Sequence, residues 1–454
     1  MDKSFRSLLQ KALNDSIAYR ESLDKRRVFP DNKMLEDLQR LNLPLPEKPG
    51  DPQKILELLS SAGSQGTTAV AGPRYFGFVI GGSTPVTLAA NWLAGAWDQN
   101  CGMDTTSPVA ALVEEIALNW VLELYGFPKT CGGAFVTGAT LAGFTCLAAA
   151  RSHLLNKQGW NVERQGLFGA PEINVIVSEE VHVTILKAFS MLGMGSERVI
   201  KILTDNKGRI LIDKIPRPDG PAIICVQAGD VNTGCFDPIS EIADKFKSDD
   251  IWIHVDGAFG LWVLVSEKLK HLAKGIEKCD SWSVDAHKWL NVPYDSGIAL
   301  VKNAGALRQA MSVRTTYLRS TPGKRQPNEY TPELSRRARG IEIWTAIASL
   351  GRAGIAELVE RCCAHAQKAA KRLSETGYEI LNEVVINQVL VSFGSDEKTE
   401  KVIKAIQEDG TCWCGGTKWK GQTAMRISIS SYATTEEDMD KSLDAMIRIA
   451  KSIN

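Results

Sequence analysis

Between residues 173 and 301 the chain alternates short apolar segments, rich in β-branched residues, with amphipathic segments of helical length. Six segments have the length and composition of strands: 173–178, 199–203, 222–228, 251–255, 281–284 and 297–301. Two segments between them have helical spacing: 181–192 and 239–246. Near-continuous apolar strands are typical of a sheet buried on both faces, and their alternation with helices is typical of parallel pairing. The pattern predicts an α/β fold with a mostly parallel sheet covered by helices.

Two polar residues stand at the carboxyl ends of neighbouring expected strands. Asp256 ends one strand within IWIHVDGAFG, and Lys288 follows another within SWSVDAHKWLN. Open α/β sheets bind ligands outside the carboxyl ends of their strands, so we expect both side chains to point into one crevice. The pair suits pyridoxal 5′-phosphate (PLP), because a lysine forms a Schiff base with that cofactor and an aspartate keeps its pyridine nitrogen protonated. The alternatives are a turn cap at Asp256 and a surface lysine at Lys288; the pairing favours the cofactor.

A glycine-rich segment, Gly132 to Gly143, precedes a helix that we expect from Leu141. Small residues let backbone N–H groups and the Thr140 hydroxyl approach a phosphate at the N-terminus of that helix. The segment lacks the Lys-Ser/Thr of nucleoside-triphosphate loops and the G-x-G-x-x-G of dinucleotide folds. A phosphate site without a nucleotide fingerprint favours PLP over ATP or NAD.

Two histidines near the expected strands receive different interpretations. His182 follows the strand 173–178 at the mouth of the sheet, where its ring can stack on a pyridine and relay a proton; a structural histidine is the alternative. His254 lies two residues before Asp256, deeper in its strand, and we expect a hydrogen-bonded core histidine there.

Composition excludes several classes of function. The 454 residues contain 53 Lys+Arg and 53 Asp+Glu, which gives no electrostatic support for binding nucleic acid or an anionic membrane. No apolar stretch is long enough to span a bilayer, and the N-terminal sequence resembles neither a secretory signal nor a transit peptide. Ten cysteines are compatible with a reducing compartment, and Cys412-Trp413-Cys414 lacks the second pair that a zinc site needs. We therefore expect a cytoplasmic protein without a metal site.

The remaining segments suggest three parts. We expect a largely helical segment over residues 4–43, a proline-rich linker and a short helix over 53–59, together forming an N-terminal part (1–70). Helices over 112–125 and 141–155 belong with the strands in a large domain (71–340). A small C-terminal α+β domain (341–454) follows, with these expected elements: helices 341–350, 355–376, 397–408 and one from Thr435, and strands 387–393 and 424–431.

Taken together, His182, HVDGA and DAHKW resemble the group II PLP-dependent amino-acid decarboxylases, which include the aromatic, histidine and glutamate decarboxylases. The resemblance extends from about Tyr75 to Tyr432. It implies the PLP-dependent transferase fold of type I, with a sheet of seven strands and a small C-terminal domain. It also implies a homodimer with active sites at the subunit interface, whose N-terminal helical segment wraps the partner. The implied reaction converts an L-amino acid to its amine and CO2.

On that pattern Lys288 is the Schiff-base lysine, Asp256 pairs with the pyridinium nitrogen, and Ala258 and His182 lie on opposite faces of the ring. The positions at which the family contacts the phosphate are Ala139, Thr140, Asp285 and His287. Tyr330 lies near the family's loop tyrosine, which protonates the substrate carbon; Tyr317 or a plain surface role are the alternatives. Arg426 would hold the substrate carboxylate or form an interdomain ion pair. Candidate pocket residues are Phe78, Thr84, Trp97, Asn100 and Trp289.

The chain departs from the family pattern in two places. Gly229 to Gly234 replaces a Gly-Thr-Thr motif, so the hydroxyl offered to the cofactor's ring oxygen must come from Thr233, or Asp230 or Asn232 replaces it. Asp285 stands where aromatic decarboxylases carry asparagine, which adds an anion near the phosphate. Other PLP reactions, by a carbon–carbon lyase, aldolase or oxidative deaminase, stay open because the fold does not fix the bond that breaks. A silent scaffold predicts damage at the lysine, aspartate or phosphate turn, and all three are intact.

Overall fold

The structure, a computed structural model, describes residues 3–313, 321 and 323–453. The chain forms two compact units. The small unit comprises Met1–Ile80, Gln367–Leu381 and Val389–Asn454, and the large unit comprises Gly81–Ala366 and Asn382–Gln388. The functional domain boundaries expected at residues 70 and 340 stay a prediction. No described helix combines the length and the apolar character needed to cross a membrane.

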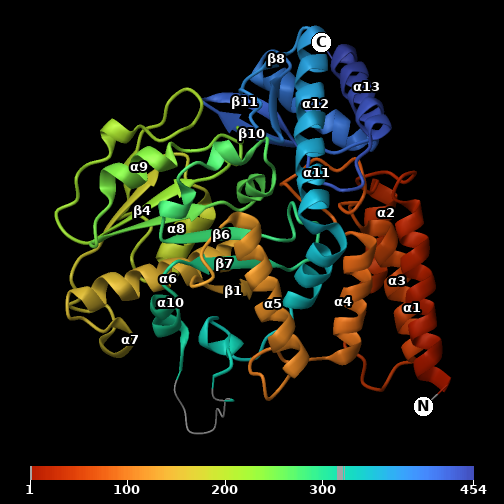
Figure 1. The fold of residues 1–454 in the computed structure, drawn as a ribbon. Coiled ribbons are helices and arrows are strands. Elements are labelled where there is room, and N and C mark those ends of the chain that lie inside the picture. Colours follow the sequence, from red (N-terminus) through yellow and green to blue (C-terminus); the bar gives the residue numbers. More distant parts are fainter. Residues whose placement is uncertain (1–2, 314–320, 322, 454) are drawn as a thin grey trace. The chain divides into compact units, whose positions relative to one another are not determined.

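The large unit contains a seven-stranded sheet in the order β1-β7-β6-β5-β4-β2-β3 (Figure 1). Its strands are β1 (Gly132–Val136), β2 (Asn174–Ser178), β3 (Ile200–Ile202), β4 (Ala222–Gln227), β5 (Ile251–Asp256), β6 (Ser281–Asp285) and β7 (Gly297–Val301). Strands β2 to β6 pair in parallel, whereas β7 is antiparallel to both β6 and β1. The six strands expected from the sequence are all present, which confirms the predicted α/β architecture.

Strand β1 corrects the sequence interpretation, which placed Gly132 and Gly133 in a phosphate-binding segment rather than in a strand. A side chain at Gly132 would come within 2.9 Å of the Cα atom of Ala304, and one at Gly133 within 2.4 Å of Leu118 Cδ1. These glycines therefore serve close packing within a strand. Only the residues after Val136 form the turn, and the following helix begins at Ala139.

The large unit also contains helices, several of which cover this sheet. They are α4 (Pro85–Trp97), α5 (Pro108–Tyr125), α6 (Ala139–Lys157), α7 (Val162–Gln165), α8 (Val183–Met191), α9 (Ile239–Phe246), α10 (Ala304–Met311) and the first part of α11 (Gly340–Glu375). No helix was expected over the residues of α4, which starts at Pro85; proline is tolerated at a first helical position. Gly351 has φ 60° and ψ 178°, so the two helices expected on either side of it meet there within α11.

One hydrophobic core joins α6, α8 and α10 to the sheet (Figure 1). Buried residues of β4 and β5, including Ile223, Cys225 and Trp252, belong to the same cluster as Leu147 and Leu154 of α6. Fully burying a leucine or isoleucine side chain contributes about 2 kcal/mol. This core fixes the N-terminus of α6 against the carboxyl ends of the strands.

The small unit is an α+β assembly. Its elements are α1 (Lys3–Ser22), α2 (Asn32–Asp37), α3 (Pro52–Gly66), the last part of α11, β8 (Glu379–Ile380), β9 (Gln388–Ser392), α12 (Asp396–Asp409), β10 (Gly415–Trp419), β11 (Gln422–Ser428) and α13 (Glu436–Ser452). The four strands form one sheet in the order β10-β11-β9-β8. The helix expected over residues 4–43 is interrupted after Ser22, and a new helix starts where the Asp31 carboxylate accepts from Met34 N at 2.9 Å.

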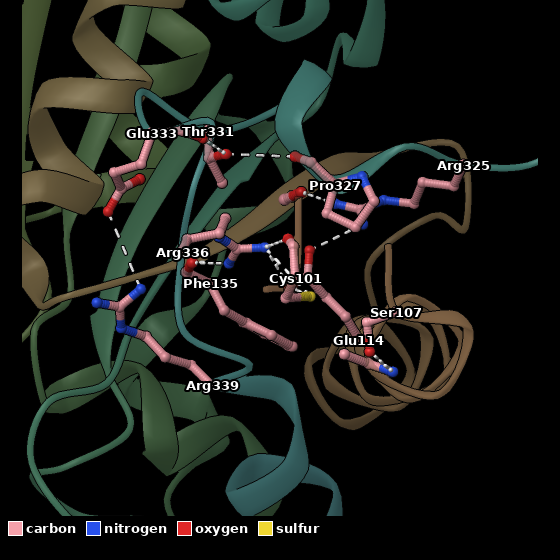
Figure 2. Close-up of polar contacts among 12 residues, drawn as sticks. Cys101, Ser107, Glu114, Phe135, Arg325, Pro327, Thr331, Glu333, Arg336 and Arg339 are labelled. Atoms are coloured by element: carbon pink, nitrogen blue, oxygen red, sulfur yellow. Dashed lines mark hydrogen bonds and ion pairs between the residues drawn. The ribbon is translucent and has the colours of Figure 1, made fainter. Parts of the chain in front are cut away.

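At the β1 edge of the large sheet, arginine side chains bind strand carbonyl groups (Figure 2). Arg325 donates to the Gly133 carbonyl at 2.7 Å, and Arg336 donates to the Phe135 carbonyl. Both arginines also bind Glu114 of α5, at 2.9 Å and 2.6 Å respectively. The segment that follows residue 323 is thereby joined to α5 and to β1, the strand that leads into the phosphate turn.

The Glu114 carboxylate and the Arg336 guanidinium are almost completely buried, with side chains 1% and 0% exposed. Burial by itself would raise the pKa of Glu114, but Arg336 and Arg325 outweigh it and hold that pKa below its usual range. A buried charge is costly unless it is paired and hydrogen-bonded. Removing any one of the three side chains would therefore leave a buried charge without its partner and destabilise the fold.

Replacing Glu114 by Gln would leave two arginines buried without their anion. We expect the free energy of unfolding near neutral pH to fall by about 3 kcal/mol, as for other broken buried ion pairs. Because the folded-state pKa of Glu114 is depressed, this contribution is complete above the ordinary glutamate pKa of about 4.3 and is lost as the pH falls through the depressed value. Urea unfolding of both proteins near neutral pH and in acid measures the difference.

The exposed neighbour Glu115 provides the matched control. Glu115→Gln should change the unfolding free energy by less than about 0.5 kcal/mol. Equal effects of the two substitutions, or a Glu114 effect that grows in acid, would contradict the assignment.

Candidate active site

A cavity of about 270 Å³ opens at the carboxyl ends of the strands in the large unit. Eight of the residues expected at the site line it: Lys288, His182, Asp256, Ala258, Ala139, Thr140, Asp285 and His287. The other lining residues are Thr137, Gly138, Thr184, Gln227, Gly229, Val231 and Phe259. The cavity therefore lies where open α/β sheets bind their ligands.

Asp285 connects two parts of this cavity. Its Oδ1 accepts a hydrogen bond from Ala139 N at 2.5 Å, and its Oδ2 lies 3.2 Å from Lys288 Nζ. The N-cap of α6, Gly138, has no side chain to bind the first N–H groups, so the Asp285 carboxylate caps the helix instead. This contact gives a physical account of the anion that was unexpected from the sequence.

The turn that carries Lys288 is held by close backbone contacts. A side chain at Gly81 would come within 1.7 Å of the Lys288 carbonyl oxygen. Asn291 donates to the carbonyl groups of Lys288 and Trp289, at 3.3 and 2.9 Å. The Lys288 amine lies 5.7 Å from the centre of the Phe259 ring. The amine thus has an apolar neighbour on one side and a carboxylate on the other.

His287 is fixed beside the same turn. Its Nδ1 accepts from Ser296 N at 3.1 Å, and its ring stacks on Tyr294 with centres 4.1 Å apart. Burial lowers the pKa of His287, although Asp285 acts in the opposite direction. A neutral ring with Nδ1 as acceptor carries its proton on Nε2, which makes it a hydrogen-bond donor toward an anion.

Asp256 lies at the floor of the cavity and is 7% exposed. Its Oδ1 accepts from Ala258 N at 3.1 Å. Burial raises the pKa of Asp256, while His182, Lys288 and the Ala258 N–H act against that rise. A buried carboxylate of this kind is stabilised by a cation such as a protonated ring nitrogen.

His182 caps α8 and borders the cavity. Its Nδ1 accepts from Thr184 N at 3.4 Å and lies 2.8 Å from the Thr184 hydroxyl. By contrast, His254 is fully buried between Ser281 and Ser283, 2.9 and 3.4 Å from its ring nitrogens, and burial lowers its pKa to about 3. The structure confirms that His254 is a hydrogen-bonded core residue.

These residues satisfy the chemical requirements of PLP. The amine of Lys288, the buried anion of Asp256 and the N-terminus of α6 face one cavity, and the amide of Gln227 lines the same wall. The family described as the pyridoxal-dependent decarboxylase conserved domain matches residues 35–394. The chain belongs to this family.

Relatives of this pyridoxal-dependent decarboxylase agree with that assignment. Aromatic-L-amino-acid decarboxylase of Bacillus atrophaeus is 27% identical over 421 residues, which cover 88% of this chain and 85% of that protein. Acidic amino acid decarboxylase GADL1 of Homo sapiens is 28% identical over 359 residues, or 76% and 68% of the two chains. The crystal structure of Oryza sativa TDC with PLP and tryptamine has the same fold, with a TM-score of 0.91 at 20% identity over 100% of this chain and 99% of that chain.

The comparisons confirm three predictions made from the sequence. The decarboxylase has the PLP-dependent transferase fold of type I. Its cofactor is PLP. Its reaction is the PLP-dependent decarboxylation of an amino acid, which makes it a carboxy-lyase. The roles of individual residues stay predictions.

Thr233 is not among the lining residues of this cavity. Its hydroxyl lies 3.1 Å from Asp230 Oδ1 and donates to the Lys207 carbonyl at 3.2 Å. Asp230 Oδ1 also accepts from the N–H groups of Asn232 and Thr233. The turn that starts at Asp230 therefore directs the Thr233 hydroxyl into the loop, and Val231 borders the cavity instead.

Three other residues of the large unit that were expected at the active site do not line the cavity. Their side chains make other contacts. Thr84 is buried, with its hydroxyl 2.9 Å from that of Thr87. Asn100 accepts from Arg336 N at 3.1 Å. Tyr330 packs against the hydrophobic core, and Arg325 lies 4.5 Å from the centre of its ring.

Three further candidates lie outside this unit or outside the described residues. Phe78 of the small unit is 58% exposed and packs near Trp413. Arg426 pairs with Gly415 across β11 and β10 of the small unit. Tyr317 lies outside the described residues.

Gln227 and Phe259 are cavity residues that the sequence interpretation did not assign. Phe259 directly follows the HVDGA motif, and Gln227 ends an expected strand, as Asp256 does. A polar residue at the carboxyl end of an apolar strand was the available signal for Gln227.

We expect Gly81→Ala to displace the Lys288 turn, because its methyl group would overlap the Lys288 carbonyl oxygen. Overpacking of this kind typically costs about 1–3 kcal/mol, so we predict a lower melting temperature and weaker retention of PLP. Thermal unfolding and the visible absorbance of the purified protein measure the two effects. Gly95→Ala in α4, where a side chain meets no atom within 4 Å, is the control; equal behaviour of the two variants would contradict the assigned contact.

Proposed function

We propose that this cavity is the active site at which the enzyme removes the α-carboxylate of an L-amino acid as CO2 and leaves the amine. The observation that supports this best is that Lys288, Asp256 and the N-terminus of α6 line one cavity. PLP needs an amine, an anion at its ring nitrogen and donors for its phosphate. The known activities of the relatives, on aromatic and acidic amino acids, define the first substrates to test.

Bound PLP supplies an electron sink for the α-carbon of an amino acid. Lys288 would hold the cofactor through its amine, and Asp285 lies close enough to exchange a proton with that amine. Asp256 would hold a proton at the ring nitrogen, a role suited to a buried carboxylate with a raised pKa. The backbone N–H groups of the α6 N-terminus, the Thr140 hydroxyl and His287 would bind the phosphate.

His182 would stack on one face of the ring and Ala258 on the other. Because His182 Nδ1 accepts from Thr184 N, the neutral ring carries its proton on Nε2. We propose that this proton would hold a carboxylate or reach the substrate carbon.

We also propose a homodimer with active sites at the subunit interface. Helices α4 and α5 expose large apolar side chains, including Trp92 (40%), Leu93 (53%) and Leu112 (58%). Exposed apolar surface of this kind is typical of protein interfaces, which a second copy would cover. Tyr330 does not line the cavity of its own subunit. In such a dimer it would donate its proton to a substrate in the partner's cavity.

We also propose a cytoplasmic location. The ten cysteines are free thiols, which supports it.

Replacing Lys288 by Ala should abolish CO2 release and the visible absorbance of bound PLP, because both depend on the amine. The measurements are the absorbance of protein reconstituted with PLP and CO2 release from aromatic and acidic L-amino acids. Lys268 is an exposed lysine paired with Glu360, and the control variant Lys268→Ala should release CO2 and absorb as the parent protein does. A retained band would contradict the Lys288 assignment. Aldehyde or carbon–carbon cleavage products without CO2 would favour the oxidative deaminase or aldolase alternatives.

If Tyr330 is the proton donor, Tyr330→Phe should lower CO2 release by about 100-fold without changing the visible band. Tyr378→Phe in the small unit is the control. The shared-site arrangement is tested by mixing Lys288→Ala subunits, which are expected to be inactive, with the strongly impaired Tyr330→Phe subunits. Hybrid dimers then contain one complete site, and about a quarter of the parent activity should return. No recovery after verified subunit exchange would contradict sites shared between subunits.

A further inference from the structure

The amide of Gln227 is a buried donor within the cavity. Gln227 is 5% exposed, and its Nε2 has no hydrogen-bond partner among the residues that the structure describes. Its backbone is fixed on both sides by Asp237, which accepts from Gln227 N at 2.7 Å and donates from its own N–H to the Gln227 carbonyl at 3.0 Å. An unsatisfied buried donor is costly, so a rigidly held one that lines a ligand cavity indicates a ligand acceptor.

The sheet register places Gln227 beside Asp256. The two residues are direct partners across the parallel strands β4 and β5. Side chains alternate along β4, so Gln227 shares a face with Ile223 and Cys225, which belong to the core that contains α6. The amide therefore lies on the β4 side of the Asp256 carboxylate, whereas Asp285 and the Lys288 turn follow β6 on its other side.

The hydroxyl groups of Thr233 and Thr184 are engaged in other contacts. The Thr233 hydroxyl binds Asp230 and the Lys207 carbonyl, and the Thr184 hydroxyl lies 2.8 Å from His182 Nδ1. The Asp230 carboxylate accepts three hydrogen bonds within its own turn and has no proton to donate in its ionised form. Gln227 is a neutral donor that lines the cavity from the end of β4.

We propose that Gln227 Nε2 donates a hydrogen bond to the oxygen at C3 of the PLP ring, replacing the hydroxyl group expected at residue 233. This inference rests on the proposed function. In PLP the C3 oxygen and the phosphate arm lie on opposite sides of the axis from the ring nitrogen to the aldehyde carbon. With the nitrogen at Asp256 and the phosphate at the α6 N-terminus beside Asp285, the C3 oxygen faces β4 and Gln227.

The chemistry of an amide suits this position. The C3 oxygen carries negative charge when the ring nitrogen is protonated, and a hydrogen bond to a charged acceptor is stronger than one to a neutral acceptor. An amide does not titrate in the pH range of a protein, so Gln227 would stabilise the oxyanion without protonating it. Together with Asp256, it would favour the form of the cofactor with a protonated nitrogen and an anionic oxygen.

The test compares two ligands on one protein. Gln227→Met keeps most of the side-chain volume and removes the donor. Cofactor-free parent and variant are titrated with PLP and with 3-deoxypyridoxal 5′-phosphate, which lacks the oxygen, and binding is followed by tryptophan fluorescence. We expect the variant to bind PLP about tenfold more weakly, or about 1.4 kcal/mol, and to bind the 3-deoxy analogue as tightly as the parent does.

The ratio of the two dissociation constants is independent of the fraction of folded protein, because both ligands meet the same preparation. Gln227→Asn, which shortens the side chain, should lose the same preference for PLP. Cys225→Ala, two residues earlier on β4, controls for disturbance of the strand and should keep that preference.

Two results separate the inference from the proposed function. Equal weakening for both ligands, or none for either, would overturn the role of Gln227 and leave the site assignment intact. A parent protein that binds neither ligand would overturn the site assignment itself.

Discussion

The carboxylate of Asp285 joins the N-terminus of α6 to the turn that carries Lys288, and the rest of the cavity is built around these two contacts. One of its oxygens binds the first N–H of α6, and the other lies beside the Lys288 amine. Ala139 at the start of α6 and Lys288 are 149 residues apart in the sequence, yet both contact this side chain. The carboxylate opposes any second anion at the same helix end, so a phosphate bound there, as proposed above, would be attracted by the backbone and repelled by Asp285.

Glu114 and Asp256 are both buried carboxylates, and their surroundings give them opposite properties. Glu114 contacts two arginines, which keep its pKa low, and it serves to join β1 to the segment containing Tyr330. Burial raises the pKa of Asp256, and its carboxylate accepts a hydrogen bond from the backbone N–H of Ala258. The first arrangement is paired within the protein, whereas the second would be completed by a cationic ligand. This difference between the two carboxylates supports the proposed role of Asp256 without reference to any relative.

The strands and the positions of Asp256 and Lys288 could be predicted from the sequence because both signals are local. An apolar run of strand length predicts a strand, and a polar residue at its carboxyl end predicts a place in the crevice. Strand β1 could not be recognised, since its glycines are required by contacts with Ala304 and Leu118, which are distant in the sequence. The role of Asp285 as a helix cap and the enclosed Thr233 hydroxyl depend on tertiary contacts and turn geometry, which no sequence period encodes.

The burial of every cysteine has a practical consequence. Burial raises the pKa of the Cys146 thiol to about 12, and all ten thiols are buried, so the native protein presents few accessible thiolates to an alkylating reagent. Cys412 and Cys414 belong to the small unit and the other eight cysteines to the large unit. Mass spectrometry of alkylated peptides over time would therefore measure the alkylation rate of the cysteines in each unit. The two rates report which unit opens first and how often.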